Sequence, residues 1–97
     1  MAWIYILECA DGSFYTGSTN DLPRRIAEHE QGIGANYTRE RLPVRLVFAE
    51  ESESIAVAFQ REKQVQGWSR AKKRALIEGR MSDLALLARN GSARSAP

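Results

Sequence analysis

Residues 2–19 read AWIYILECADGSFYTGST, and this stretch predicts a β-hairpin. Its two strand-like runs, 2–9 and 13–19, lie on either side of Asp11-Gly12, a dipeptide typical of tight hairpin turns. The first run is apolar at successive positions, so both of its faces are hydrophobic. Strands of this kind are covered on both faces, and we therefore expect residues 2–9 to form the central strand of a sheet.

The length of the hairpin loop decides which side chains share a face. A two-residue turn pairs Cys9 with Phe14 and places the tyrosines of the two strands on opposite faces. A three-residue loop, with Gly12 in a left-handed conformation, pairs Cys9 with Ser13 instead. We favour the three-residue loop.

In this register, Tyr5 lies opposite Gly17 and Tyr15 lies opposite Leu7, all on one face. Because Gly17 has no side chain, we expect it to leave space above the strand for the backbone of a ligand. Two aromatic residues on one face are more often core than chemistry, so the tyrosines alone do not indicate a site.

Capping residues, glycine stops and apolar alternation predict the remaining elements. In chain order we expect a helix from Asp21 to about Glu30, a polar loop over 31–43, a strand over 44–50, helices over 54–66 and 69–78, and a short last helix from Ser82. This β-β-α-β-α-α-α order is typical of an α+β domain with helices packed on a small, mainly antiparallel sheet. We expect a single domain over 1–89 and a disordered tail over 90–97.

The composition narrows the class of protein. A chain of 97 residues, 43% of them hydrophobic, fits one globular domain. Cys9 is the only cysteine and His29 the only histidine, which excludes an intrachain disulfide and metal sites built on several thiolates or imidazoles. No run resembles a signal peptide or the ~20 apolar residues of a membrane span, so we expect a cytoplasmic protein without a membrane partner.

The charge is unevenly distributed. The net charge is only +2, but residues 61–80 contain seven basic and two acidic side chains. Eleven of the fourteen basic residues are arginine, which suits bidentate contacts with phosphate. A basic stretch of this kind is either a solvated helix face or a nucleic-acid contact, and the charge alone leaves both open.

The helix expected over 54–66 has a carboxylate inside its apolar stripe. Ile55, Ala58, Phe59 and Val65 form the stripe, and Glu62 takes the place of an apolar residue within it. A buried charge needs a cation, a cationic partner or an open cleft. A salt bridge to an arginine and metal ligation are both open from the sequence.

The first expected helix turns Leu22 and Ile26 inward and carries Arg25 and His29 side by side at the edge of that face. Taken singly, Arg25 is more typical of an arginine in an ion pair, and His29 of a histidine with satisfied hydrogen bonds, than of functional residues. Together with the two tyrosines and Glu62, however, they supply what phosphodiester hydrolysis needs: a cation on the phosphate, a base or positioned water, and a metal-bound carboxylate.

The spacing of these residues matches a known pattern. The residues that carry it are Ile4-Tyr5-Ile6, Tyr15-Thr16-Gly17, Arg25, His29 and Glu62, with GANYTR at 34–39, PVRLV at 43–47 and GWSRAKK at 67–73. Over about residues 2–79, the chain resembles the GIY-YIG nuclease domain, and within it the stand-alone bacterial YhbQ-like proteins. Trp3 and Thr16 stand where the family motifs carry glycine and isoleucine.

The resemblance implies a three-stranded antiparallel sheet flanked by helices, and metal-dependent cleavage of DNA, as in DNA repair or processing. It implies that Glu62 holds Mg²⁺, with Mn²⁺ as an alternative. Tyr5 would be the general base or a relay to it, and Tyr15 would orient the water or the scissile phosphate. Arg25 would stabilise charge on the phosphorus centre, and His29 would assist proton transfer or phosphate positioning.

A small nuclease must also hold its DNA, whether single-stranded, duplex or branched. The side chains available for this are those of Tyr37, Arg39 and Arg41 in the loop and Arg70, Lys73 and Arg74 on the basic helix, with Gly17 beside the catalytic set. Two other functions stay open: a nucleic-acid-binding module without turnover, and a nuclease subunit that needs a protein partner to capture its substrate.

Overall fold

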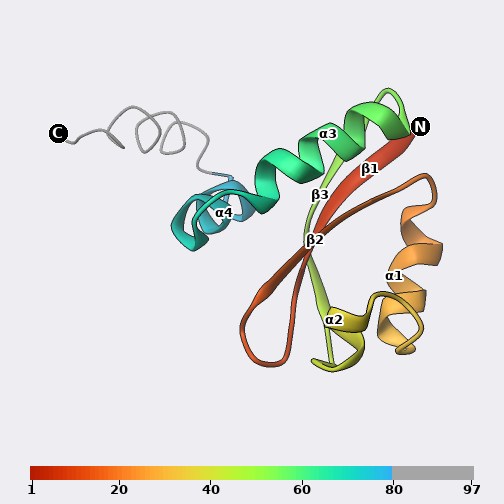
Figure 1. Cartoon of the computed structure of the whole chain (residues 1–97), viewed down its shortest axis with the longest axis vertical. Coiled ribbons are helices and arrows are strands. Elements are labelled where there is room, and N and C mark those ends of the chain that lie inside the picture. Colours follow the sequence, from red (N-terminus) through yellow and green to blue (C-terminus); the bar gives the residue numbers. More distant parts are fainter. Residues whose placement is uncertain (80–97) are drawn as a thin grey trace, which may run out of the picture. The chain divides into compact units, whose positions relative to one another are not determined.

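The computed structural model describes residues 1–79, which fall into two compact units, Met1–Gln66 and a second that begins at Gly67 (Figure 1). The last helix expected from Ser82, the end of the domain expected at 89 and the tail over 90–97 lie outside the described residues. In the described part of the chain, no helix is long and apolar enough to cross a bilayer.

The elements confirm the expected α+β class. The first unit contains β1 (Ala2–Glu8), β2 (Phe14–Thr19), α1 (Leu22–Glu30), α2 (Asn36–Arg39), β3 (Arg45–Ser52) and α3 (Ile55–Gln66), and the second contains α4 (Arg70–Ile77). The helix α2 was not predicted, and it lies inside the segment expected to be a loop. Its four residues are too few to show a helical apolar period, and Ala35 before it provides no side-chain cap.

The hairpin has the register that the three-residue loop predicts. Tyr5 is paired with Gly17 and Leu7 with Tyr15. The Cys9 amide donates to the Ser13 carbonyl at 2.8 Å, and Gly12 has a φ of +84°. The tyrosines of the two strands therefore share a face.

The strand β1 is central, as expected, because the sheet order is β2-β1-β3 and both pairings are antiparallel. Its residues Ile4 to Leu7 are buried on both faces. The pairing with β3 shifts between Ile6, which meets Phe48, and Leu7, which meets Leu46, so Val47 is an extra residue in β3. This bulge interrupts the simple alternation expected for the third strand.

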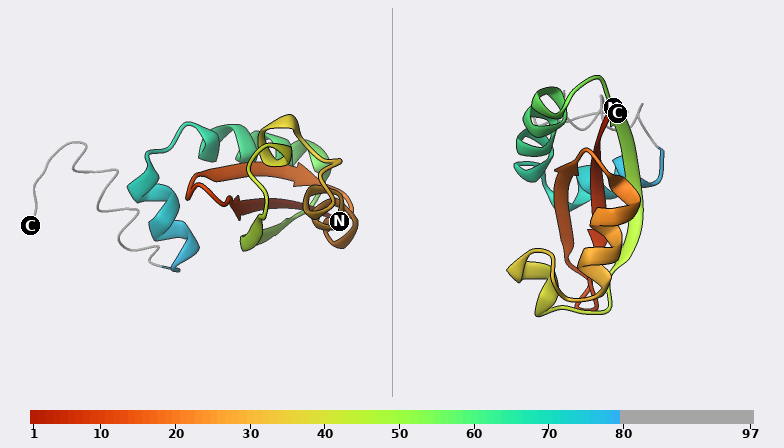
Figure 2. Two further views of the ribbon diagram at one scale, coloured as in Figure 1. Left: turned by 90° about the horizontal axis from the view of Figure 1, so that it is seen from below. Right: turned by 90° about the vertical axis from the view of Figure 1, so that its right-hand side faces the viewer.

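The helices α1 and α3 cover different faces of the sheet, and the strands lie between them in Figures 1 and 2. Leu22 and Ile26 of α1 pack against the cluster around Tyr5. Glu62 of α3 instead accepts a hydrogen bond from Ser18, at 2.6 Å. Since Ser18 follows Gly17 in β2, its side chain points to the face opposite that of Tyr5.

The prediction that Ile55 and Phe59 belong to the buried stripe of α3 is wrong. Their exposed fractions are 41% and 50%, whereas Ala58, Glu62 and Val65 are buried. These three residues are spaced by four and three positions, so they form a narrow stripe that the helix presents to the sheet. Ile55 and Phe59 flank this stripe. The expected burial of Glu62 is confirmed.

The helix of the second unit also agrees with its prediction. Ser69 caps it, with its hydroxyl accepting from the Lys72 amide at 3.2 Å. Gly79 follows with a φ of +77°, as a glycine after a helix end commonly does. Lys72 lies over the ring of Trp68, with 4.8 Å between its ammonium nitrogen and the ring centroid.

The hairpin register depends on Gly12, which gives a first prediction. A Cβ atom at this position meets nothing within 4 Å, so Gly12→Ala costs only backbone strain from the positive φ. We expect a loss of about 1 kcal/mol in the free energy of unfolding, measured by urea denaturation. Gly12→Asn is the matched control and should lose less, since asparagine tolerates this conformation. Equal losses in the two variants would contradict the assignment.

Candidate functional site

The centre of the candidate site is a buried hydrogen bond between Tyr5 of β1 and His29 of α1. The Tyr5 hydroxyl lies 2.8 Å from His29 Nε2, and the two residues are 1% and 0% exposed. The expectation that His29 lies at the helix edge beside Arg25 is therefore wrong. His29 follows Leu22 by seven residues and Ile26 by three, which places it on the inward stripe.

The other nitrogen of His29 is bound by a residue that the sequence analysis did not identify. His29 Nδ1 lies 2.8 Å from the hydroxyl of Thr38 in α2, and this hydroxyl donates to the main-chain carbonyl of Ala35 at 3.0 Å. Thr38 is fully buried. Its position within GANYTR was the only available signal, and an unpredicted helix presents it.

Two glycines make room for the two rings. A Cβ atom on Gly17 would lie 2.5 Å from the Tyr5 hydroxyl, and one on Gly34 would lie 2.5 Å from His29 Nδ1. The space above Gly17, which we expected a ligand backbone to use, is thus filled by the phenol of Tyr5. Both glycines are required by close packing of site residues rather than by an unusual φ.

Tyr15 is half-buried and joins this cluster. Its ring centroid lies 6.4 Å from that of Tyr5 and 5.2 Å from that of His29. Tyr15 also stacks with Tyr37, and the two ring centroids are 6.0 Å apart. The structure thereby brings three of the expected catalytic side chains together, with Tyr37 supporting Tyr15.

Arg41 covers a face of Tyr37, and its guanidinium carbon lies 3.8 Å from the ring centroid. Its nitrogens also donate to Asp11 at 3.1 Å and to the Tyr37 carbonyl at 3.0 Å. The sequence predicts Tyr37 and Arg41 as side chains available to hold DNA. Their partners inside the protein instead give both residues a structural role, which ties the α2 segment to the hairpin.

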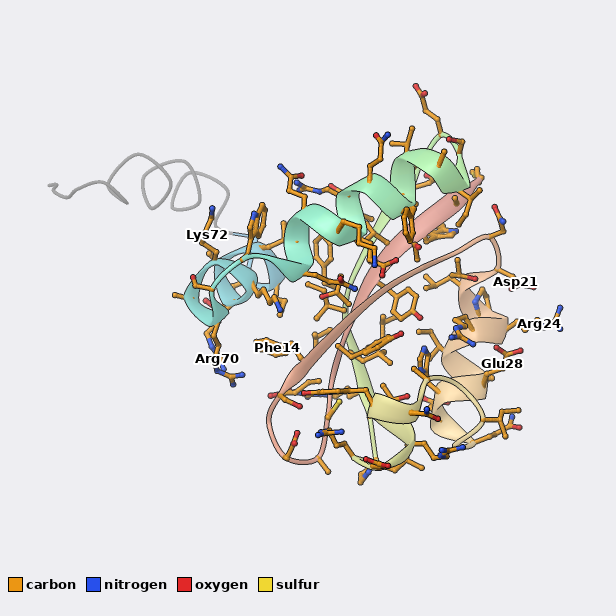
Figure 3. The ribbon with its side chains drawn as sticks, in the orientation of Figure 1. Phe14, Asp21, Arg24, Glu28, Arg70 and Lys72 are labelled. Atoms are coloured by element: carbon orange, nitrogen blue, oxygen red, sulfur yellow. The ribbon has the colours of Figure 1, made fainter. Side chains whose placement is uncertain are left out.

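Arg25 joins the cluster to the surface. Its guanidinium forms an ion pair with Glu28 at 3.0 Å and lies close enough to Tyr5 to oppose the rise in the pKa of that phenol. Glu28 also pairs with Arg24 at 3.4 Å, on the outer side of α1 (Figure 3). Arg25 lines a polar cavity of about 350 Å³ with its neighbours Thr19, Asn20, Asp21, Arg24 and Glu28.

Burial controls the protonation of the two rings. It raises the pKa of Tyr5 to about 12, against the opposing effect of Arg25. It lowers the pKa of His29 to about 4, and the charge of Arg25 adds to this effect. The pKa of Tyr15 is also raised, chiefly by burial. At neutral pH the site therefore holds neutral phenols and a neutral imidazole.

Glu62 does not share the face of the tyrosines, so the side chains expected to act together lie on both faces of the sheet. It lies across the edge strand β2, where its carboxylate accepts from Ser18 at 2.6 Å and from the Gln66 amide at 2.8 Å. It is 9% exposed, and it forms no ion pair with any residue in 1–79. Its charge is near enough to contribute to the raised pKa values of Tyr5 and Tyr15.

The predicted nucleic-acid contacts lie in both units. Arg39 of α2 is exposed and makes no ion pair with another residue of the described part of the chain. Lys73 and Arg74 follow Arg70 by three and four residues on α4, so both are neighbours of Arg70 on the helix surface. Arg74 also lies 3.9 Å from Glu78.

Residues 1–75 match the GIY-YIG catalytic domain, a stretch that contains the tyrosine–histidine cluster, Arg25 and Glu62. The chain belongs to the GIY-YIG family. GIY-YIG proteins form a nuclease family that acts on nucleic acids and generally depends on a divalent metal. The resemblance seen in the sequence is confirmed.

Stand-alone relatives within the GIY-YIG family are similar along most of their length. The chain is 49% identical to a UPF0213 protein of Natronomonas pharaonis over 75 residues, which are 77% of this chain and 88% of the relative. It is also 49% identical to a UPF0213 protein of Halobacterium salinarum over 77 residues, 79% of this chain and all of the relative.

Two solution NMR structures share the fold. A UPF0213 protein of Bacillus halodurans is 48% identical with a TM-score of 0.52, over 80% of this chain and 84% of that one. A protein of E. faecalis is 35% identical with a TM-score of 0.54, over 79% and 82%. They support the three-stranded antiparallel sheet with flanking helices.

The buried imidazole predicts a pH dependence of stability. In the folded protein, His29 stays neutral down to a pKa of about 4, whereas in the unfolded chain it is protonated below about 6.5. The unfolded state therefore binds an extra proton between these values, and the free energy of unfolding should fall as the pH drops from about 6.5 to about 4. Thermal melts across this range measure the effect.

The carboxylates also titrate towards the lower end of that range, so His29→Gln provides the comparison. We expect the variant to have a flatter profile between pH 6.5 and pH 5, while both proteins lose stability below that. Identical slopes for the two proteins above pH 5 would show that His29 is not buried as a neutral group.

Gly17→Ala tests the packing under Tyr5. The new methyl group would have to displace the phenol, and with it the hydrogen bond to His29. We expect a loss of about 1–3 kcal/mol in the free energy of unfolding, measured by urea denaturation. Gly34→Ala should give a similar loss through the imidazole. Wild-type stability in both variants would contradict the close contacts.

Proposed function

We propose that this protein is an endonuclease that hydrolyses phosphodiester bonds of DNA with Mg²⁺, or Mn²⁺ in its place, in DNA repair or processing. The observation that carries this proposal is the buried hydrogen-bonded pair of Tyr5 and His29 with the Arg25 guanidinium near the phenol. A structural core gains little from placing a guanidinium on a buried tyrosine–histidine pair. A reaction that moves a proton beside a phosphate requires both.

Tyr5 and His29 would move the proton. With a pKa of about 12, Tyr5 is not a phenolate at neutral pH, so it cannot serve as a base by itself. It can instead pass its proton to His29 Nε2, 2.8 Å away, as it takes one from the attacking water. We therefore give Tyr5 the relay role and His29 the role of final acceptor.

Arg25 would bind the scissile phosphate. It lines the polar cavity and also lies close enough to Tyr5 to affect the pKa of the phenol, so it lies between solvent and the relay. The guanidinium of Arg25 forms an ion pair with Glu28, and a phosphate would compete with Glu28 for it. The negative charge of the phosphate would offset that of Arg25, which removes one cause of the low pKa of His29. Substrate binding would thus make His29 a better acceptor.

Tyr15 would orient the attacking water or the phosphate. It is the half-buried member of the cluster and is therefore more accessible than Tyr5, which is 1% exposed. Its ring contacts those of His29 and Tyr37, and these two contacts hold it in place. A fixed phenol can position a water without changing its own protonation.

The chemistry around Glu62 fits a hard divalent cation. A buried carboxylate without a cationic partner in residues 1–79 favours a positive ion, and the Ser18 hydroxyl adds an oxygen atom beside it. No cluster of three or more acidic, histidine or cysteine side chains occurs among these residues, so Glu62 would be the charged ligand. When bound, Mg²⁺ would supply charge stabilisation for the phosphate oxygens.

Binding of DNA would rest on few basic side chains. Arg39 in the first unit and Arg70, Lys73 and Arg74 in the second are the proposed phosphate contacts. A net charge of +2 gives weak general attraction, so a protein partner for substrate capture remains part of the proposal. A binding module without turnover is the alternative, but a buried carboxylate near the phosphate would weaken binding unless a cation were present.

Cleavage assays test the proposal directly. Purified protein is incubated with labelled single-stranded, duplex and branched DNA, with Mg²⁺, Mn²⁺ or a chelator. We expect metal-dependent cleavage that falls by about 100-fold or more in Glu62→Gln and in Arg25→Ala. Glu50→Gln and Arg45→Ala are the matched controls, because Glu50 pairs with Arg61 and Arg45 with Glu8, outside the site.

The controls should cleave like the wild type. Cleavage that survives in both site variants would indicate a contaminating nuclease and contradict the site. Binding of DNA without cleavage on any substrate and with either metal would favour the binding module.

A further inference from the structure

The groups around Tyr5 determine where its proton points. Tyr5 is 1% exposed, and the Arg25 guanidinium near the phenol can only donate. The hydroxyl proton therefore needs an acceptor inside the protein. His29 Nε2, 2.8 Å away, can accept it only when that nitrogen carries no proton of its own.

The groups on the other side of His29 give the same answer independently. The Thr38 hydroxyl donates to the Ala35 carbonyl at 3.0 Å, and a carbonyl can only accept. The single proton of the Thr38 hydroxyl is used in that bond. Its oxygen, 2.8 Å from His29 Nδ1, is then an acceptor, so Nδ1 must carry the imidazole proton.

We propose that Thr38 is the positioning residue that holds His29 in the tautomer protonated on Nδ1, which leaves Nε2 free to take the proton of Tyr5. Hydrogen bonds then run in one direction, from Tyr5 through His29 and Thr38 to the main-chain carbonyl of Ala35. Gly34 contributes by letting the ring approach this segment.

The fixed direction matters for the proposed hydrolysis, on which the catalytic part of this inference rests. With the other tautomer, Nε2 would donate to the Tyr5 oxygen and could accept nothing, so the relay would be blocked. Thr38 is fully buried and cannot touch DNA. Loss of the Thr38 hydroxyl should therefore lower kcat by at least about tenfold and leave KM nearly unchanged.

The tautomer can be measured without any nuclease activity. His29 is the only histidine in the chain, so untagged protein labelled with ¹⁵N gives one set of imidazole signals. Long-range ¹H–¹⁵N correlation spectra at pH 7 distinguish a protonated ring nitrogen from an unprotonated one. We expect protonated Nδ1 and unprotonated Nε2 in the wild type and in Thr38→Ser, and a shift towards protonated Nε2 in Thr38→Val.

Thr16→Val is the matched control. Thr16 is a buried threonine on the α3 side of the sheet, and its hydroxyl has no hydrogen-bond partner within residues 1–79. The same loss of a hydroxyl there should leave the His29 spectrum and the cleavage rate as in the wild type. A change equal to that of Thr38→Val would mean that any buried Thr→Val change disturbs the ring, and would overturn the proposal.

The wild-type spectrum alone is decisive even if Thr38→Val fails to fold. Protonated Nε2 in the wild type overturns the tautomer assignment, whether or not the protein cleaves DNA. Absence of cleavage with the expected spectrum would instead contradict only the proposed function. Recovery of kcat in Thr38→Ser together with its loss in Thr38→Val supports the relay, and equal kcat in all three proteins overturns its catalytic part.

Discussion

The hydrogen bond between Tyr5 and His29 is the contact on which the rest of the site depends. It joins the central strand to α1 through the most deeply buried rings of the protein, and it fixes what the neighbouring positions can be. Gly17 and Gly34 lack side chains because these rings occupy the space. The imidazole also recruits Thr38, which brings the α2 segment against the sheet. One polar pair in an apolar core thus organises three separate segments, and it does so because each buried polar atom needs a partner.

Local rules were sufficient for most of the fold. The left-handed Gly12 implied the hairpin register, and the unbroken apolar run of β1 implied its central place. These features depend on neighbours in sequence and on a strict two-residue period. The short helix α2 could not be predicted, because four residues are held by tertiary contacts such as that of Thr38 rather than by their own periodicity.

The site was predicted by residue type better than by geometry. Tyr5, Tyr15 and His29 form a cluster, and the register implied that the two tyrosines share a face. The burial of His29 was not predicted, although its spacing from Leu22 and Ile26 indicates the inward face of the helix. The place of Glu62 could not be deduced, because a helix position predicts burial and not which face of the sheet the helix covers. The roles of Tyr37 and Arg41 depend on contacts with Tyr15 and Asp11, residues distant in sequence.

The depth of the two rings also limits what the protein can recognise. Tyr5 and His29 are almost fully buried, so Arg25 and Tyr15 are the side chains of this cluster that could contact the phosphate of a substrate. In the proposed roles, Arg25 and Tyr15 contact the phosphate and its water and not the edge of a base in a groove. A nuclease built in this way would be indifferent to base sequence at the cleavage point. Its choice of target would have to come from the shape of the DNA or from another protein that brings the strand to it.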